Sequence, residues 1–337
     1  MTNDPVRLAT PARASWQQQL RDAVRDVAEL AALLELPRDA IAADAAARDF
    51  PLLVPRAYIA RMKKGDPRDP LLLQVLPTAL EAVEVPGFTH DPLSESEFAE
   101  AGLVRKYRDR SLLITTGACP VHCRYCFRRS FPYADQLAAR NDFADALERL
   151  ARDGTKEAIL SGGDPLSLGN ARLASLLERL AALPALRRVR VHTRFPIVLP
   201  DRIDRGLVAL LERARVDVVI VLHTNHPREI DEDVAGALRA LRGAGVTLLN
   251  QSVLLRGIND DADTLAELSE RLFECRTLPY YLHLLDPVAG AAHFDVGGPR
   301  AEAIYRELLA RLPGYLVPRL VREIPGQASK TPIRLGL

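Results

Sequence analysis

The stretch TGACPVHCRYCFRR, residues 116–129, decides the fold expected of this chain. It places three of the four cysteines, Cys119, Cys123 and Cys126, close together. Thiolates are soft ligands that bind zinc or iron–sulfur clusters. A structural zinc site closes its shell with four ligands, whereas a cubane cluster held by three thiolates leaves one iron open to a small molecule. The spacing therefore favours a reactive cluster.

Two plainer interpretations of these cysteines stay open at this point. In one, His122 completes a zinc site with the three thiolates; in the other, the thiols are buried and bind nothing. The fourth cysteine, Cys275, lies alone in a helical pattern, and no second cysteine pair with zinc-like spacing follows. Iron and sulfide analysis after anaerobic reconstitution separates a cubane cluster from both.

The composition is that of an ordinary globular protein, with 48% hydrophobic and 26% charged residues among 337. A formal net charge of +1 gives no electrostatic reason to expect nucleic acid or membrane as a partner. The first residues form no apolar signal core, no apolar run approaches a membrane span, and the clustered cysteines suit a reducing compartment. We therefore expect a cytoplasmic protein, and its oligomeric state, a homo-oligomer included, stays open.

The first 95 residues are expected to form an accessory helical region. Apolar residues recur there at helical spacing, and prolines end the segments. The expected helices are 16–36, 38–49, 55–63 and 69–75.

From about residue 111 the pattern changes to short runs of Val, Ile and Leu that alternate with amphipathic segments. Such runs are typical of parallel strands with both faces buried. Strands are expected at 112–115, 158–160, 189–192, 216–222, 247–254 and 280–285, and helices at 143–152, 173–182, 203–214, 234–244 and 264–275. The alternation predicts an α/β fold, and periodicity alone leaves a curved barrel and a flat doubly wound sheet as alternatives.

Polar residues capable of chemistry stand where these strands end. They are the cysteine stretch after the first strand, 161–165 after the second, 192–194 on the third, 223–227 after the fourth, 250–252 on the fifth and Asp286 after the sixth. The carboxyl ends of parallel strands meet on one side of a barrel. We therefore expect these residues to share one site.

The cysteine spacing, with Tyr125 directly before the third cysteine, resembles that of the radical S-adenosylmethionine (SAM) enzymes. The resemblance implies a partial (β/α)6 barrel of the TIM type and a [4Fe-4S] cluster whose open iron binds SAM. It also implies that Gly162, Gly163 and Asp164, in SGGDPL, contact the SAM amino group. Paired glycines suit this role because they let a ligand approach the backbone closely.

Further residues are expected at SAM by the same resemblance. His223, Gln251 and Arg194 match donors that hold the SAM carboxylate, and Tyr125 belongs with the cofactor-contacting residues. A histidine near a strand end is more simply a structural residue, and that interpretation stays open for His192 and His226.

The stretch EIPGQASKTPI, residues 323–333, holds one lysine, Lys330, among small residues and prolines. Most lone lysines are solvated surface charges. A lysine can instead hold pyridoxal phosphate (PLP) covalently when a pocket lowers its pKa and aligns it with the aldehyde. The stretch resembles the PLP-binding loop of lysine 2,3-aminomutases, which is usually richer in glycine.

Five motifs narrow the resemblance to the lysine 2,3-aminomutase family from about residue 85 onward. In order they are CRYCFRR, SGGDPL, NQSVLLRGIND, LLDPVAGAAHF and SKTP. The nearest pattern is that of its short bacterial branch, the elongation factor P–(R)-β-lysylation enzymes, which lack the zinc-binding extension of the longer aminomutases. We accordingly expect a radical SAM barrel over residues 96–300 and a segment carrying the PLP lysine over 301–337.

The resemblance assigns further residues to PLP and to the substrate. Lys330 matches the lysine that holds PLP, while Lys106 and Arg110 match cations that hold its phosphate. The family usually has arginine at the first of these positions, and lysine still binds phosphate as a point charge. Arg128 matches the guanidinium that pairs with the substrate α-carboxylate.

Asp286 and Glu323 match carboxylates that meet the side-chain ammonium of lysine inside a closed site. The free-lysine enzymes have aspartate where this chain has Glu323, and the added methylene moves the carboxylate by about 1.5 Å. The plainer interpretation of both acids is a salt bridge at the barrel rim.

Together these matches imply an isomerase that moves the α-amino group of L-lysine to the β-carbon, using an external one-electron reductant. The resemblance links the β-lysine product to elongation factor P and its lysyl-ligase-like enzyme. The alternatives are a free-lysine 2,3-aminomutase that supplies metabolism and a radical SAM enzyme that does not use PLP.

Overall fold

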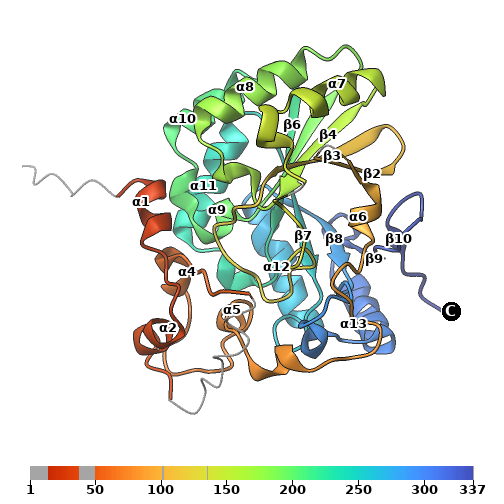
Figure 1. Cartoon of the computed structure of the whole chain (residues 1–337). Coiled ribbons are helices and arrows are strands. Elements are labelled where there is room, and N and C mark those ends of the chain that lie inside the picture. The colour runs from red at the N-terminus through yellow and green to blue at the C-terminus, as the bar shows by residue number, and fades with distance from the viewer. Residues whose placement is uncertain (1–13, 38–49, 101, 135, 337) are drawn as a thin grey trace, which may run out of the picture.

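One sheet of ten strands organises the computed structural model, which describes residues 14–37, 50–100, 102–134 and 136–336 (Figure 1). The strands are β1 Ala99–Glu100, β2 Leu103–Tyr107, β3 Arg110–Thr116, β4 Glu157–Gly162, β5 Arg188–Thr193, β6 Asp217–His223, β7 Thr247–Val253, β8 Leu278–His283, β9 Arg319–Arg322 and β10 Thr331–Pro332. They follow one another in chain order across the sheet. A doubly wound sheet reverses its strand order at a switch point, so this order is that of a barrel.

Strands β3 to β9 run parallel, while β1 and β2 at one edge and β10 at the other pair antiparallel with their neighbours. The predicted α/β partial barrel is therefore confirmed, and its six expected strands are β3 to β8. The sequence did not predict β2 and β9. Both are short and carry charged residues, as LVRKY and RLVR, so they lack a continuous apolar run.

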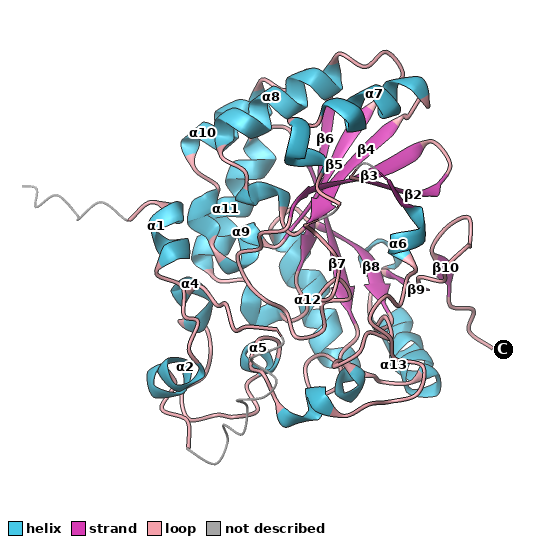
Figure 2. Cartoon of the chain, viewed as in Figure 1, coloured by secondary structure: helices cyan, strands magenta, loops and turns pink. Residues whose placement is uncertain are grey.

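Helices cover the outer face of the curved sheet (Figure 2). The longer ones are α7 Ala144–Arg152, α8 Asn170–Ala181, α10 Arg205–Glu212, α11 Glu232–Gly243, α12 Ala262–Glu274 and α13 Gly298–Arg311. The shorter ones among the strands are η3 Ala138–Asn141, η4 Pro165–Ser167, α9 Phe195–Val198, η5 Pro200–Arg202, η6 Pro227–Glu229, η7 Ala292–Phe294 and η8 Gly314–Leu316. Asp204, Asp231 and Asp261 begin α10, α11 and α12 by accepting a hydrogen bond from a first-turn N–H.

The N-terminal region is helical but more broken than predicted. Its helices are α1 Trp16–Arg21, α2 Val27–Leu33, α4 Arg56–Ile59, α5 Pro70–Leu73, η2 Ala79–Ala82 and α6 Glu95–Phe98. The prediction of one continuous helix over 16–36 is wrong, because Val24 forms an isolated bridge with Val54 and Asp26 caps a new helix. The helices expected at 55–63 and 69–75 are single turns, α4 and α5, and the one expected at 38–49 lies outside the described residues.

These N-terminal helices share their core with the barrel. Trp16, Leu30 and Tyr58 belong to the same buried cluster as the apolar residues of β3 to β7. Trp16 also packs edge-on against Phe195 of α9, with ring centroids 5.7 Å apart. In the described ranges, no helix is both long and apolar enough to cross a bilayer.

Candidate active site

A cavity of about 280 Å³ runs inside the curved sheet. Every residue that the sequence assigned to a cofactor or to the substrate lines it. These residues are Lys106, Arg110, Cys119, Cys123, Tyr125, Cys126, Arg128, Gly162, Gly163, Asp164, Arg194, His223, Gln251, Asp286, Glu323 and Lys330. The cysteine loop and the C-terminal lysine, far apart in sequence, therefore face the same space.

Side chains from the two edges of the sheet meet beside this cavity. Tyr107 ends β2 at one edge, and Glu323 follows β9 at the other. The Tyr107 hydroxyl donates to Glu323 Oε1 at 2.7 Å, and Lys106 Nζ lies 3.7 Å from the same oxygen. Lys106 thus lies on β2, a strand that the sequence did not predict.

The three cysteines stand at the wall of the cavity, each partly exposed. Burial, with Cys123 adding to it, raises the pKa of the Cys126 thiol to about 11. Burial also raises the pKa of Cys119 well above its usual value, with Cys126 contributing. Thiolates that lie this close raise one another's pKa, and coordination to metal removes their protons. The three cysteines therefore fit a cluster that binds each of them as a thiolate.

His122 turns away from the cysteines. Its Nδ1 lies 2.7 Å from the carbonyl of Pro51, and its ring stacks on Phe50 with centroids 4.9 Å apart. A zinc site completed by His122 does not match this orientation. Within the described ranges no three His, Cys, Asp or Glu side chains lie close enough to hold a single ion, and a cubane places its three thiolates on separate irons.

The glycine pair after β4 packs against the backbone of the cysteine loop. Gly163 N donates to Thr116 O at 2.7 Å and Asp164 N to Ala118 O at 2.8 Å. A Cβ on Gly163 would stand 2.3 Å from Ala118 O, so only glycine fits. Sequence reasoning assigned these glycines to SAM alone, but they also bring the loop against the barrel.

The Asp164 carboxylate is engaged by protein groups. It accepts from Thr193 Oγ1 at 2.8 and 2.9 Å, from Arg194 N at 2.7 Å and from Leu166 N at 3.0 Å. Burial raises its pKa to about 6 even though these hydrogen bonds oppose the shift. Its side chain therefore fixes the turn, and only the backbone around it is open to a ligand.

His223 and Gln251 are partners in the parallel register of β6 and β7, so their side chains point to the same face. Burial lowers the pKa of His223 to about 3, with Arg194 acting in the same direction. Its Nε2 is buried and has no hydrogen-bond partner among the described residues. The neutral ring can thus give one hydrogen bond to a molecule in the cavity.

Arg194 lies differently from the expectation. Its two terminal nitrogens bind protein groups, which include Cys123 Sγ at 2.7 Å and Glu229 Oε2 at 3.0 Å. The Tyr125 hydroxyl, 2.5 Å from Nη1, joins the same network. Both residues line the cavity, and Arg194 Nε is buried without a hydrogen bond from the described residues, so the assignment of Arg194 to SAM stays a prediction.

The other part of the cavity contains buried polar atoms that make no hydrogen bond to the described residues, although Lys106 Nζ lies within 3.7 Å of the Glu95 and Glu323 carboxylates. Lys106 Nζ, Arg110 Nε and Asp286 Oδ1 are buried without a hydrogen bond from the part of the chain described. Burial without a partner costs free energy, so these atoms indicate a missing polar ligand. A phosphate oxygen suits Lys106 and Arg110, and a ligand cation suits Asp286.

Asp286 and Glu323 differ in how their charges are balanced. Burial raises the pKa of Asp286 to about 7, and the ammonium of Lys330 opposes the shift. Burial acts in the same direction on Glu323, but Lys330 and Tyr107 outweigh it and lower the pKa below its usual value. Lys330 Nζ donates to Glu323 Oε2 at 2.5 Å, which keeps that carboxylate ionised.

Arg128 is clamped by a residue that the sequence gave no reason to notice. Its Nε donates to Glu95 Oε2 at 2.6 Å and its Nη2 to Glu95 Oε1 at 2.9 Å. Its Nη1 donates to Ser161 Oγ at 2.9 Å. Glu95 is buried and also lies 3.6 Å from Lys106 Nζ.

His192 and His283 also line the cavity with an Nε2 that none of the described groups binds. Burial lowers the pKa of both rings well below the usual value. The position of each at a strand end was the available signal, and sequence reasoning left open whether His192 is structural. Glu95 stands in the single turn α6, which forms no motif.

A family model described as the Radical SAM superfamily matches residues 113–268, from β3 into α12. The matched segment holds the loop of three thiols beside the cavity and most of the sequential parallel sheet, and so contains a radical SAM domain. One solved structure, native anSMEcpe with bound AdoMet, aligns with a TM-score of 0.45 at 13% identity, over 59% of this chain and 58% of that one.

Closer relatives narrow the class. The L-lysine 2,3-aminomutase of Escherichia coli (strain K12) is 49% identical over 98% of each chain. The L-lysine 2,3-aminomutase of Clostridium subterminale is 34% identical over 94% of this chain and 77% of its own length. The chain therefore belongs to the L-lysine 2,3-aminomutase family, a family of isomerases, and membership implies a [4Fe-4S] cluster, SAM and PLP.

Proposed function

We propose that this chain moves the α-amino group of L-lysine to the β-carbon, and that the β-lysine is used to modify elongation factor P. The observation that carries the proposal is that Lys330 and the three thiols line one cavity. When bound, the cluster with SAM would supply a carbon radical that takes a substrate hydrogen, and PLP would carry the migrating nitrogen. A radical must be made close to its target, because a misplaced one removes the wrong hydrogen.

Cys119, Cys123 and Cys126 hold the cluster, and Lys330 holds PLP. Lys106 and Arg110 bind the PLP phosphate; what supports this assignment is that Lys106 Nζ and Arg110 Nε are buried without a hydrogen bond in the described chain. Tyr107 places its ring under the Arg110 guanidinium, 4.5 Å from the ring centroid, and so limits how that side chain can turn.

SAM, when bound, would be held by residues of the cysteine loop and of the strand ends. The backbone around Gly162, Gly163 and Asp164 receives its amino group, and His223 and Gln251 orient its carboxylate. The shared register of His223 and Gln251 and the free Nε2 of His223, judged over the described residues, support these assignments.

Arg128 binds the substrate α-carboxylate through the edge that the protein leaves open. A guanidinium has five N–H donors. Glu95 takes two of them and Ser161 takes one, so one N–H remains on each terminal nitrogen. These two donors lie side by side in the geometry that a carboxylate binds bidentately. Glu95 therefore fixes the direction in which Arg128 presents them.

Asp286 and Glu323 bind the ammonium at the other end of lysine. Burying an ammonium without anions costs several kcal/mol. Two carboxylates in the cavity that Arg128 also lines would therefore select a substrate with both charges. Glu323 is longer than the aspartate of the free-lysine enzymes, and this difference, with the five-motif pattern, supports the link to elongation factor P. The proposal places the reaction in the cytoplasm with an external one-electron reductant.

The deciding experiment is to supply isotopically labelled L-lysine to the anaerobically reconstituted protein with SAM, PLP and dithionite. Labelled β-lysine is expected, and its formation should require all three additions. Unchanged lysine after turnover of a protein loaded with both cofactors would reject the proposal.

Two further measurements address the alternatives. If PLP is held by Lys330, the absorbance of the protein-bound imine should disappear in Lys330→Ala; an unchanged spectrum favours a radical SAM enzyme that does not use PLP. Addition of elongation factor P and its lysyl-ligase-like enzyme should attach the labelled β-lysine, identified after hydrolysis, to the factor. Free β-lysine that the ligase does not use favours the metabolic alternative.

A further inference from the structure

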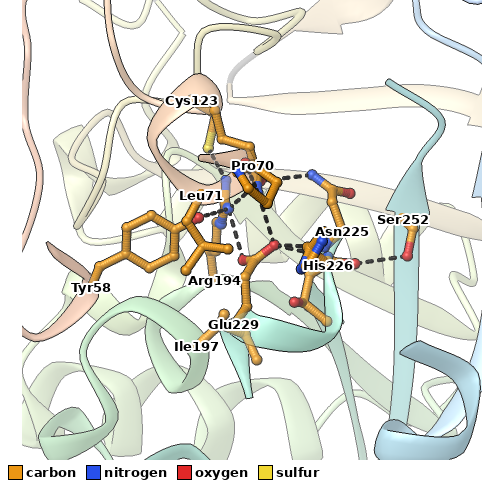
Figure 3. A network of polar contacts seen from close by, with 12 residues as sticks. Tyr58, Pro70, Leu71, Cys123, Arg194, Ile197, Asn225, His226, Glu229 and Ser252 are labelled. Atoms are coloured by element: carbon orange, nitrogen blue, oxygen red, sulfur yellow. Dashed lines mark hydrogen bonds and ion pairs between the residues drawn. The ribbon is translucent and has the colours of Figure 1, made fainter. Parts of the chain in front are cut away.

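A buried network of polar side chains lies behind the cysteine loop (Figure 3). Arg194, which follows β5, stands between Cys123 and Glu229 in this view. Its Nη1 donates to Cys123 Sγ at 2.7 Å, and its Nη2 donates to Glu229 Oε2 at 3.0 Å. One guanidinium thus joins a cluster thiol to a carboxylate.

The guanidinium has little freedom to move. Nη2 also donates to Gln74 Oε1 at 2.7 Å, and Nη1 contacts the Tyr125 hydroxyl at 2.5 Å. The Tyr58 hydroxyl lies 3.3 Å from Nη2, and Tyr58 is fully buried. Arg194 itself is only 5% exposed. The donor aimed at the thiol is therefore fixed in place by the surrounding protein.

Glu229 is held as firmly from its other side. It is fully buried, and its Oε1 accepts from Asn225 N at 2.9 Å, from His226 N at 3.1 Å and from Gln74 Nε2 at 3.1 Å. These bonds do not involve Arg194, so the carboxylate would keep its position without the guanidinium.

Burying an ion pair costs more free energy than filling the same volume with apolar side chains. Removing two charges from water costs several kcal/mol for each ion, and apolar residues of the same volume are often as stable. The pair therefore calls for a role other than packing. A donor beside a sulfur ligand changes the electronic properties of a cluster, as do burial and local charge.

We propose that Arg194 and Glu229 set the reduction potential of the iron–sulfur cluster through Cys123, with Arg194 acting as a positioning residue. The positive guanidinium favours the reduced cluster, which carries one more electron, and raises its potential. The negative carboxylate, 3.0 Å from Nη2, opposes that effect. The inference rests on the proposed function, because it requires that Cys123 binds the cluster.

The test is a redox titration of the anaerobically reconstituted protein in the absence of SAM, followed by electron paramagnetic resonance of the reduced cluster. One electron passes from dithionite to the oxidised cluster, and no bond is made or broken. Arg194→Met removes the donor and its charge, so the midpoint potential should fall. Glu229→Gln keeps the shape but removes the opposing charge, so the potential should rise.

Opposite shifts in these two variants support the proposal, and Arg194→Met/Glu229→Gln should lie between them. Arg202→Met is the matched control, because Arg202 is also fully buried but bonds the Leu166 and Leu168 carbonyls. Its potential should stay at the wild-type value.

Equal potentials in all variants, or shifts of one sign, overturn the proposal. Loss of the cluster from Arg194→Met and Glu229→Gln, with an unshifted potential in any fraction that remains, makes the network purely structural and also overturns it. A wild-type protein that binds no cluster is a different result, because it rejects the proposed function itself.

Discussion

Lys330 and Glu323 form an ion pair at the wall of the cavity, with Nζ 2.5 Å from Oε2. In our proposal Glu323 also receives the ammonium of the substrate. The ion pair belongs to the protein without cofactor, because Lys330 would carry no ammonium of its own while bonded to PLP, and Glu323 would then be open to an incoming substrate ammonium. One carboxylate can thus serve the resting protein first and the substrate afterwards, while Tyr107 holds its other oxygen at 2.7 Å.

Glu323→Gln should weaken lysine binding because it removes this anion. A hydrogen bond to a charged group contributes about 1.5–3 kcal/mol, so KM for lysine should rise about ten- to hundredfold. Norleucine, which has no side-chain ammonium, should be affected much less. Glu323→Asp keeps the charge and serves as the control. Equal losses on lysine and norleucine would contradict the ammonium contact.

The raised pKa of Asp286 predicts that the affinity for lysine depends on pH. Burial raises its pKa to about 7, with Lys330 and Lys106 opposing the shift and Glu323 and Glu95 adding to it. Below that pH the carboxyl is neutral and cannot pair with an ammonium, so lysine affinity should fall up to about tenfold per pH unit. KM measured from pH 6 to 8 should show this fall in the wild type. The slope should be absent from Asp286→Asn, and a slope that persists there belongs to another group.

The same carboxyl has the opposite effect on stability. Its pKa is higher in the folded protein than the ordinary value of 3.8, so the folded state holds the proton over a range where the unfolded chain has lost it. Stability from this group therefore decreases as the pH rises from about 4 to about 7. Asp286→Asn should unfold at a higher temperature than the wild type at pH 8, by thermal denaturation, with the difference shrinking toward pH 4.

Glu95→Gln should weaken lysine binding although Glu95 does not touch the substrate in our proposal. The amide cannot accept two charge-assisted hydrogen bonds from Arg128, so the guanidinium loses its fixed direction. KM for lysine should rise about tenfold or more, in the same direction as for Arg128→Lys. Retained SAM cleavage shows that the cluster is intact. A normal KM in Glu95→Gln, with a raised one in Arg128→Lys, would separate the two residues.

The barrel could be predicted because its parallel strands bury both faces and therefore appear in the sequence as continuous runs of apolar residues. Strand β4, EAILSG, is buried throughout, and three of the barrel helices, α10, α11 and α12, begin at aspartate caps. Strands β2 and β9 could not be predicted in this way. Their pairing depends on neighbours at the open edges of the sheet, and their charged side chains point into the site or to solvent. The break after α1 was missed because it depends on the bridge between Val24 and Val54. The spacing of apolar residues along a helix gives no sign of such a contact.

The residues of the candidate site likewise fall into those that the sequence could predict and those that it could not. The cysteine spacing and Lys330 were visible because each is part of a local motif. Glu95 was not, because its partner Arg128 is distant in sequence. The ion pair of Arg194 was missed for the same reason: Glu229 reaches it only through the fold. A residue type at a strand end predicts that a side chain reaches the site, but not which of its atoms remain available.

Gly163→Ala should reduce the amount of cluster that the protein holds. The added Cβ would lie 2.3 Å from Ala118 O, so the loop that carries Cys119 must move away from β4. Gly169→Ala is the matched control, because its Cβ meets no atom within 4 Å among the described residues and its φ of −66° suits alanine. Iron and sulfide content after identical reconstitution should fall severalfold in Gly163→Ala and stay at the wild-type level in Gly169→Ala. Full iron content in Gly163→Ala would show that the cysteine loop tolerates displacement, and the close approach of the two loops would then have no part in holding the cluster.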